Sequence, residues 1–130
     1  MPLHLRICSI VCLASALQAT AVIACPLTEP ALKKGDITAI WSVDGPAIAV
    51  GKHFALNVRV CPVDSKLVRV NATMPEHRHG MNYRASVKPL SDGLWRVEGM
   101  MFHMPGRWEL RLDVQSATQT ETLVDNVNLR

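Results

Sequence analysis

Alternation of apolar and polar residues with a period of two is the main pattern along this chain. It is most regular over residues 107–114, where charged residues separate Trp108, Leu110, Leu112 and Val114. Because successive side chains of a β-strand point to opposite faces, this pattern predicts a strand with one buried face. Residues 53–61 repeat it, and the apolar face there consists of Phe54, Leu56, Val58 and Val60.

Further segments follow the same pattern less regularly and are predicted strands: residues 36–43, 67–74, 83–90, 94–102 and 121–129. The inward side chains expected in them are Ile37, Ala39, Trp41, Val43, Val68, Val70, Ala72, Met74, Trp95, Val97 and Met101. Turn signals separate the segments, and none shows a helical stripe. Six to seven short strands with such spacing predict an all-β fold, an immunoglobulin-like antiparallel β-sandwich. Trp41, Trp95 and Trp108 are expected to anchor its core.

The first 24 residues have the character of a signal peptide. A weakly basic start containing His4 and Arg6 precedes a short apolar run, and small residues follow it. The predicted domain organisation is therefore a signal peptide (1–24), an N-terminal leader (25–35) and one sandwich domain (36–130). This organisation predicts an exported protein, periplasmic in a bacterium. Cleavage removes one arginine and no acidic residue, so the formal charge changes from +3 to +2, which does not favour nucleic acid as a partner.

Two cysteines remain after cleavage, Cys25 and Cys61. A single pair in an exported protein predicts one disulfide bond. A second interpretation stays open, because Val22-Ile23-Ala24-Cys25 also has the form of a lipobox, which would make Cys25 the acylated first residue of a membrane-anchored lipoprotein.

Two short segments concentrate the metal-binding side chains of the chain. We call residues 74–81 (MPEHRHGM) the first loop and residues 102–106 (FHMPG) the second loop. An antiparallel meander through the intervening strands would bring both loops to one end of the sandwich, where loops on a rigid frame carry function. The two-residue spacing of His77, His79 and Met81 would direct their side chains to one side of an extended backbone.

The candidate metal ligands are therefore His77, His79, Met81, His103 and Met104. Imidazole and thioether together suit copper, and thioether is a poor ligand for zinc. The alternative is structural: the histidines bond backbone groups and the methionines fill the core. His53 begins a strand elsewhere and is expected to be structural.

These motifs resemble the YtkA-like domain family, which is related to FixH-like proteins. The resemblance extends from about Trp41 to Val114. It depends on MPxHxHG at residues 74–80, VEG at 97–99 and MPGxWEL at 104–110. It implies a small exported or membrane-tethered immunoglobulin-like module with a suggested connection to metal or respiratory-chain biology.

Two functions follow as hypotheses. The first is an exported module that stores or delivers copper through the two loops. The second is a metal-free interaction module that helps a membrane or respiratory complex to assemble, with a membrane or periplasmic protein as partner. An enzyme is not expected, since the chain has no Gly-x-Ser-x-Gly elbow and no phosphate-binding glycine loop.

Overall fold

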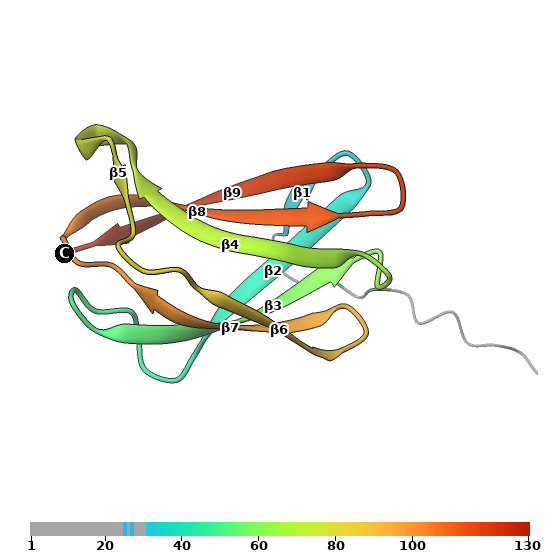
Figure 1. Ribbon diagram of the computed structural model, residues 1–130, viewed down its shortest axis with the longest axis horizontal. Helices are drawn as coiled ribbons and strands as arrows, with labels where there is room; N and C mark the ends of the chain where they lie inside the picture. Colours follow the sequence, from blue (N-terminus) through green and yellow to red (C-terminus); the bar gives the residue numbers. More distant parts are fainter. Residues whose placement is uncertain (1–24, 26, 28–30) are drawn as a thin grey trace, which may run out of the picture.

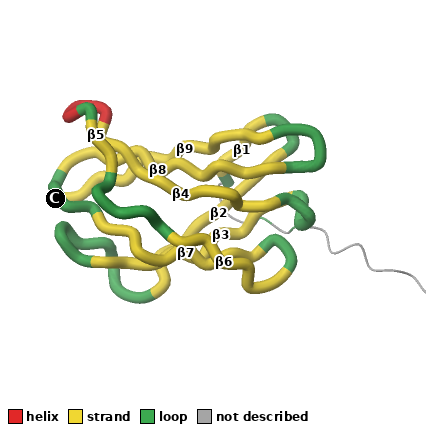
Figure 2. The backbone as a smooth tube through the Cα atoms, in the orientation of Figure 1, coloured by secondary structure: helices red, strands yellow, loops and turns green. Residues whose placement is uncertain are grey.

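The computed structural model describes residue 25, residue 27 and residues 31–130. Two antiparallel sheets pack face to face (Figures 1 and 2). The elements are β1 (Leu32–Lys34), β2 (Ile37–Asp44), β3 (His53–Cys61), β4 (Lys66–Met74), the 3-10 turn η1 (Pro75–His77), β5 (His79–Gly80), β6 (Ser86–Ser91), β7 (Leu94–Met101), β8 (Gly106–Gln115) and β9 (Thr120–Leu129).

The strand order identifies the architecture. One sheet has the order β1-β2-β3-β7-β6, and the other has the order β5-β4-β8-β9. Without the short β1 and β5, these are the two sheets of an immunoglobulin-like sandwich, in which strands one, two, five and four form one layer. The predicted fold is confirmed. The described chain contains two short strands beyond the expected number, because β1 lies in the expected leader and β5 lies in the first loop.

The core lies between the sheets and follows the predicted alternation most closely in β8. Trp108, Leu110, Leu112 and Val114 are each at most 1% exposed. Leu56, Val58 and Val60 of β3 face them from the other sheet and are fully buried. Phe102, directly after β7, stacks on Trp108 with ring centroids 4.7 Å apart.

Two β-bulges change which residues face the core, and each overturns one expectation. In β4 the pairing with β8 shifts between Leu67 and Arg69, so Leu67 is buried and Val68 is 48% exposed. In β7 the left-handed φ of +79° at Gly99 accompanies an extra residue opposite β3. Met100 is consequently buried where Met101 was expected.

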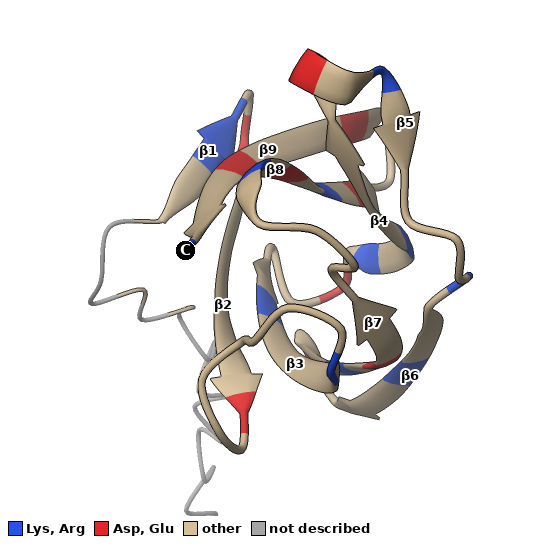
Figure 3. Cartoon of the chain, turned by 90° about the vertical axis from the view of Figure 1, so that its left-hand side faces the viewer, with Lys and Arg blue, Asp and Glu red and all other residues tan. Residues whose placement is uncertain are grey.

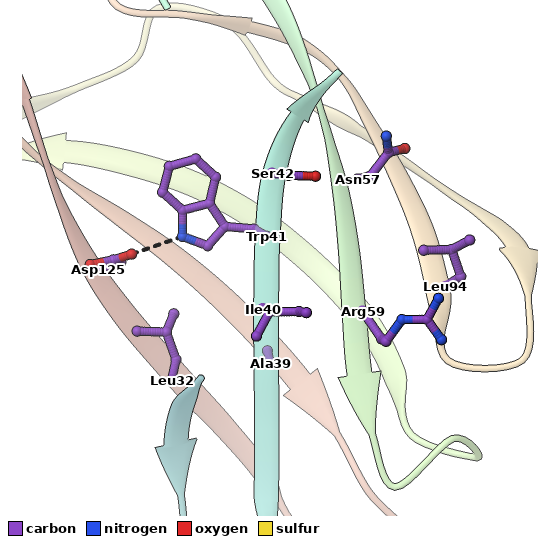
Figure 4. A pocket seen from close by; sticks show the side chains of 9 residues that line it. All are labelled: Leu32, Ala39, Ile40, Trp41, Ser42, Asn57, Arg59, Leu94 and Asp125. Carbon is purple, nitrogen blue, oxygen red and sulfur yellow. Dashed lines mark hydrogen bonds between the residues drawn. The ribbon is translucent and has the colours of Figure 1, made fainter. Parts of the chain in front are cut away.

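Only one of the three tryptophans anchors the core as predicted. Trp108 is fully buried, whereas Trp41 and Trp95 are partly exposed. Trp41 extends from β2 to β9, where its Nε1–H donates a 2.9 Å hydrogen bond to Asp125 (Figure 4). It ties the two sheets together at their edge.

Cys25 and Cys61 form the predicted disulfide, with Cα atoms 5.9 Å apart. A sulfur in a disulfide cannot also carry the lipid thioether of a lipoprotein, so this pairing favours the first interpretation of Cys25. The predicted signal peptide lies outside the described residues. Among the residues that the structure describes, no helix has the length and apolar character needed to span a bilayer.

We predict that Trp108→Ala lowers the free energy of unfolding by about 3–5 kcal/mol, because it removes a fully buried indole. Arg111→Ala on the same strand is the matched control and should change it by about 0.5 kcal/mol or less, since that side chain is 41% exposed. Urea unfolding of both variants measures the difference. Equal midpoints would contradict the assigned face of β8.

We also predict that reduction of the disulfide destabilises the protein by about 3–4 kcal/mol, the chain-entropy effect of closing a loop of this length. The two cysteines are 36 positions apart in the sequence. Thermal unfolding with and without reductant tests this expectation. A Cys25→Ala/Cys61→Ala variant should match the reduced protein and should not respond to reductant.

Candidate functional site

Both histidine-containing loops lie at one end of the sandwich, at the left of Figure 1. The imidazole centroids of His79, from the first loop, and His103, from the second, are 5.0 Å apart. The predicted meeting of the loops is confirmed, but the predicted meander is not the route. β4 and β6 belong to different sheets, and residues 81–85 carry the chain between them. β4 and β7 nevertheless both end at this pole.

The first loop is not extended throughout, as the spacing argument had assumed. Pro75–His77 form one 3-10 turn, and Arg78 closes it in the left-handed region at φ 55°, donating its N–H to Pro75 at 3.3 Å. His77 is therefore exposed on the turn. The extended backbone assumed for the loop is found only after this turn, in β5. His79 pairs opposite the buried Met74, and the N–H of Met81 donates to the Ala72 carbonyl at 3.1 Å.

The second loop is held in place by the core beneath it. The Nε1–H of Trp108 donates a 3.0 Å hydrogen bond to the Met104 carbonyl. Gly106 starts β8 with φ +121°, a conformation that L side chains rarely adopt. A Cβ at Gly106 would lie 2.8 Å from the terminal methyl group of Met74. Close contact with the core thus determines the position of His103.

The three predicted histidines form a row of rings against Trp108. His79 is the central ring, 5.8 Å from His77 and 5.0 Å from His103 by centroid. Trp108 contacts His79 at 5.8 Å and His103 at 5.3 Å, both in edge-on geometry. A loop residue from each sheet therefore meets the same buried indole.

The hydrogen bond of His79 determines which of its nitrogens is free. Its Nδ1 lies 3.2 Å from the carbonyl oxygen of Gly80. Since a carbonyl oxygen only accepts, Nδ1 must carry the proton in this bond. The neutral ring then has its lone pair on Nε2, the arrangement found in metal-ligating histidines whose other nitrogen donates to a backbone carbonyl.

His103 supplies an unsatisfied nitrogen at the same place. Its Nδ1 is buried and has no hydrogen-bond partner within the described part of the chain. An unpaired buried polar atom costs about 1–3 kcal/mol, so such an atom calls for a ligand or a functional explanation.

The ring separations are compatible with a shared metal ion. With imidazole nitrogen about 2 Å from a metal, two ligating rings on one ion have centroids roughly 5–6 Å apart. Over residues 25, 27 and 31–130, however, no three or more His, Cys, Asp or Glu side chains form a group able to hold a metal. A site here accordingly requires a thioether beside the imidazoles. Met81 and Met104 are both partly buried and pack against the core.

An ion-pair cluster fixes the turn that carries His77. Arg107 of β8 reaches Glu76 at 3.3 Å and Glu109 at 3.2 Å, and it donates to Asn126 at 3.0 Å. These contacts are largely exposed, so each contributes little to stability. Their effect is to hold the tip of the first loop over β8.

Sequence reasoning missed two parts of this pole. Trp108 was expected only in the core, yet it also contacts His79 and His103. Residues 45–52, which we call the 45–52 loop, lie between two predicted strands and were given no role. Their run of small apolar residues between two glycines was the available signal. His53 lies outside the row, with its ring 5.3 Å from Tyr83.

Comparison with known proteins gives one match. The family model described as YtkA-like matches residues 41–113, which is more than half of the chain and includes both loops. No match to the chain was found among curated proteins or among solved structures.

We predict that Gly106→Ala destabilises the protein more than Gly45→Ala does. Both glycines have positive φ, +121° and +114°, so both variants incur backbone strain of about 1–3 kcal/mol. Only at Gly106 does the added methyl group meet another atom within 4 Å, the end of the buried Met74 side chain. Thermal unfolding of the two variants checks the order. Equal losses would show that Met74 moves aside freely.

Proposed function

The chain belongs to the YtkA-like family, and from this premise we propose that it is an exported module that binds copper for storage or delivery. The ion would be held as Cu(I) where the two loops meet. It is cargo in this proposal, and the chain performs no chemistry on it.

The observation that carries the proposal is the pair formed by His79 and His103. The pairing of His79 Nδ1 with the Gly80 carbonyl leaves its Nε2 lone pair available. The buried Nδ1 of His103 lacks a partner among the described residues. Because their ring centroids are only 5.0 Å apart, we expect these two side chains to bind the same ion.

The remaining residues favour a soft ion. Met104 follows His103 directly, and Met81, two positions beyond His79, packs against the core. Thioether sulfur binds Cu(I) and is a poor zinc ligand. Trp108 covers the inner side of the histidine pair and limits access of water there, which suits an ion that needs few ligands. His77 is exposed on the turn and would serve as an entry ligand.

The disulfide supports the proposed export to an oxidising compartment. Disulfides persist in oxidising compartments such as the periplasm. Export would keep the module on the same side of the membrane as its cargo and its recipients.

A competition titration with a chromophoric Cu(I) chelator tests the proposal. We predict that His79→Ala and His103→Ala each weaken copper affinity about tenfold or more, since even loss of a supporting residue costs a metal site that much. His53→Ala is the matched control and should bind as wild type does. Affinity should also fall as the pH is lowered, because metals bind the neutral imidazole ring.

The second candidate function is a metal-free interaction module. The observation that favours it is the lack of a three-membered His, Cys, Asp or Glu group in the described residues. The same titration separates the two functions. Absence of stoichiometric copper binding, or unchanged affinity in both histidine variants, would leave the interaction module as the better explanation.

A further inference from the structure

The 45–52 loop connects β2 to β3 at the same pole as the histidines. Glycines with left-handed backbone stand near its two ends, Gly45 at φ +114° and Gly51 at φ +70°. The Gly51 amide donates a 2.8 Å hydrogen bond to the carbonyl of Phe102, the residue before His103. A further bond of 3.2 Å, from Lys52 N–H to the Ala49 carbonyl, closes its last turn. The loop is therefore attached to the backbone of the second loop.

The loop displays apolar side chains to solvent and covers a hollow. Pro46, Ala47 and Ala49 are exposed, and Val50 is 36% exposed. Beneath the loop lies a cavity of about 490 Å³. Its apolar wall consists of Pro46, Ala47, Ala49, Phe54 and Ala55. This apolar wall suits contact with an apolar side chain of a partner.

The next feature is the set of charged residues around the cavity. On its far wall, Arg96 bonds Asp44 and Glu98, and Lys88 bonds Glu98. The hydrogen bond from Lys88, and then that from Arg96, holds the pKa of the Glu98 carboxyl below its usual range. This cluster of two cations and two anions is neutral.

Lys52, at the rim of the cavity, has no ion-pair partner among the described residues. Among the described residues, three carboxylates on turns form no ion pair: Asp36, Asp64 and Asp92. All three lie at the end of the sandwich opposite to Lys52. Figure 3 shows the histidine pole face on, with cationic and anionic residues both distributed around it. The uncompensated charge at this cavity is therefore positive.

We propose that this cavity is a docking site for a partner protein, which it binds through a short acidic segment with an apolar anchor residue. The anchor packs against the apolar wall beneath the 45–52 loop, and an acidic neighbour pairs with Lys52. A protein segment fits better than a lipid surface, because the exposed side chains are small and include no aromatic residue in the 45–52 loop. The inference extends the proposed function, since the 45–52 loop over this site is bonded to the carbonyl of Phe102, the residue before His103.

The test is a titration of isotope-labelled, disulfide-intact protein, free of copper, with a synthetic peptide that has a central leucine flanked by glutamates. A matched peptide carries lysines in place of the glutamates. We expect amide chemical-shift changes confined to residues 44–55 and 96–98, with the acidic peptide only. Lys52→Glu should weaken its affinity roughly fivefold, the effect of about 1 kcal/mol at a rim charge.

Lys66→Glu is the control, an equal charge change on an exposed residue at the opposite end, and it should leave the affinity unchanged. Thermal unfolding of both variants verifies the fold. The proposal is overturned if shifts are absent or lie elsewhere, if the lysine peptide binds equally, or if both variants lose affinity equally. Binding to phosphatidylcholine–phosphatidylglycerol vesicles in place of the peptide would assign the loop to a membrane surface. Because no copper is present, these outcomes are independent of the titration that tests the metal site.

Discussion

The packing of Trp108 is the interaction on which the rest of this structure depends. Its indole is fully buried and stacks on Phe102 at 4.7 Å, so it joins the two sheets at the pole. Its one polar atom is satisfied by the Met104 carbonyl, 3.0 Å away. An apolar anchor thus also fixes the backbone of the second loop. The histidines then meet above it because both of their loops are fitted to the same side chain.

This arrangement explains why a polar pair is tolerated so close to the core. His79 is approached by the ring of His77 from the turn, whereas His79 and His103 both contact the apolar ring of Trp108. A buried nitrogen without a partner is unfavourable, and the fold maintains one at His103. Since the surrounding strands over-determine the position of the loop, the energy of core packing offsets this local penalty.

The alternation of apolar residues was enough to predict the sandwich, and the pole followed from strand direction. β8 shows why: it carries no bulge in its pairing with β9, so its period of two persists along ten residues. The prediction failed where one extra residue entered a strand, at Val68 and near Gly99, since a bulge exchanges the two faces without changing the composition. It failed again at His77, where a 3-10 turn and Arg78 in the left-handed region replaced the extended backbone.

The contacts among loops could not be predicted, because they join segments that are distant in sequence. Nothing near Gly51 indicates that its amide bonds the Phe102 carbonyl, some fifty positions later. That bond has a consequence for function. The proposed docking loop is bonded to Phe102, and the next residue of the same backbone segment is the proposed copper ligand His103. Under the two proposals, a shift of this segment on binding of one partner would alter the binding of the other, and such a coupling would be reciprocal. The two proposals together would join recognition of a recipient to release of the ion through the hydrogen bond between Gly51 and Phe102.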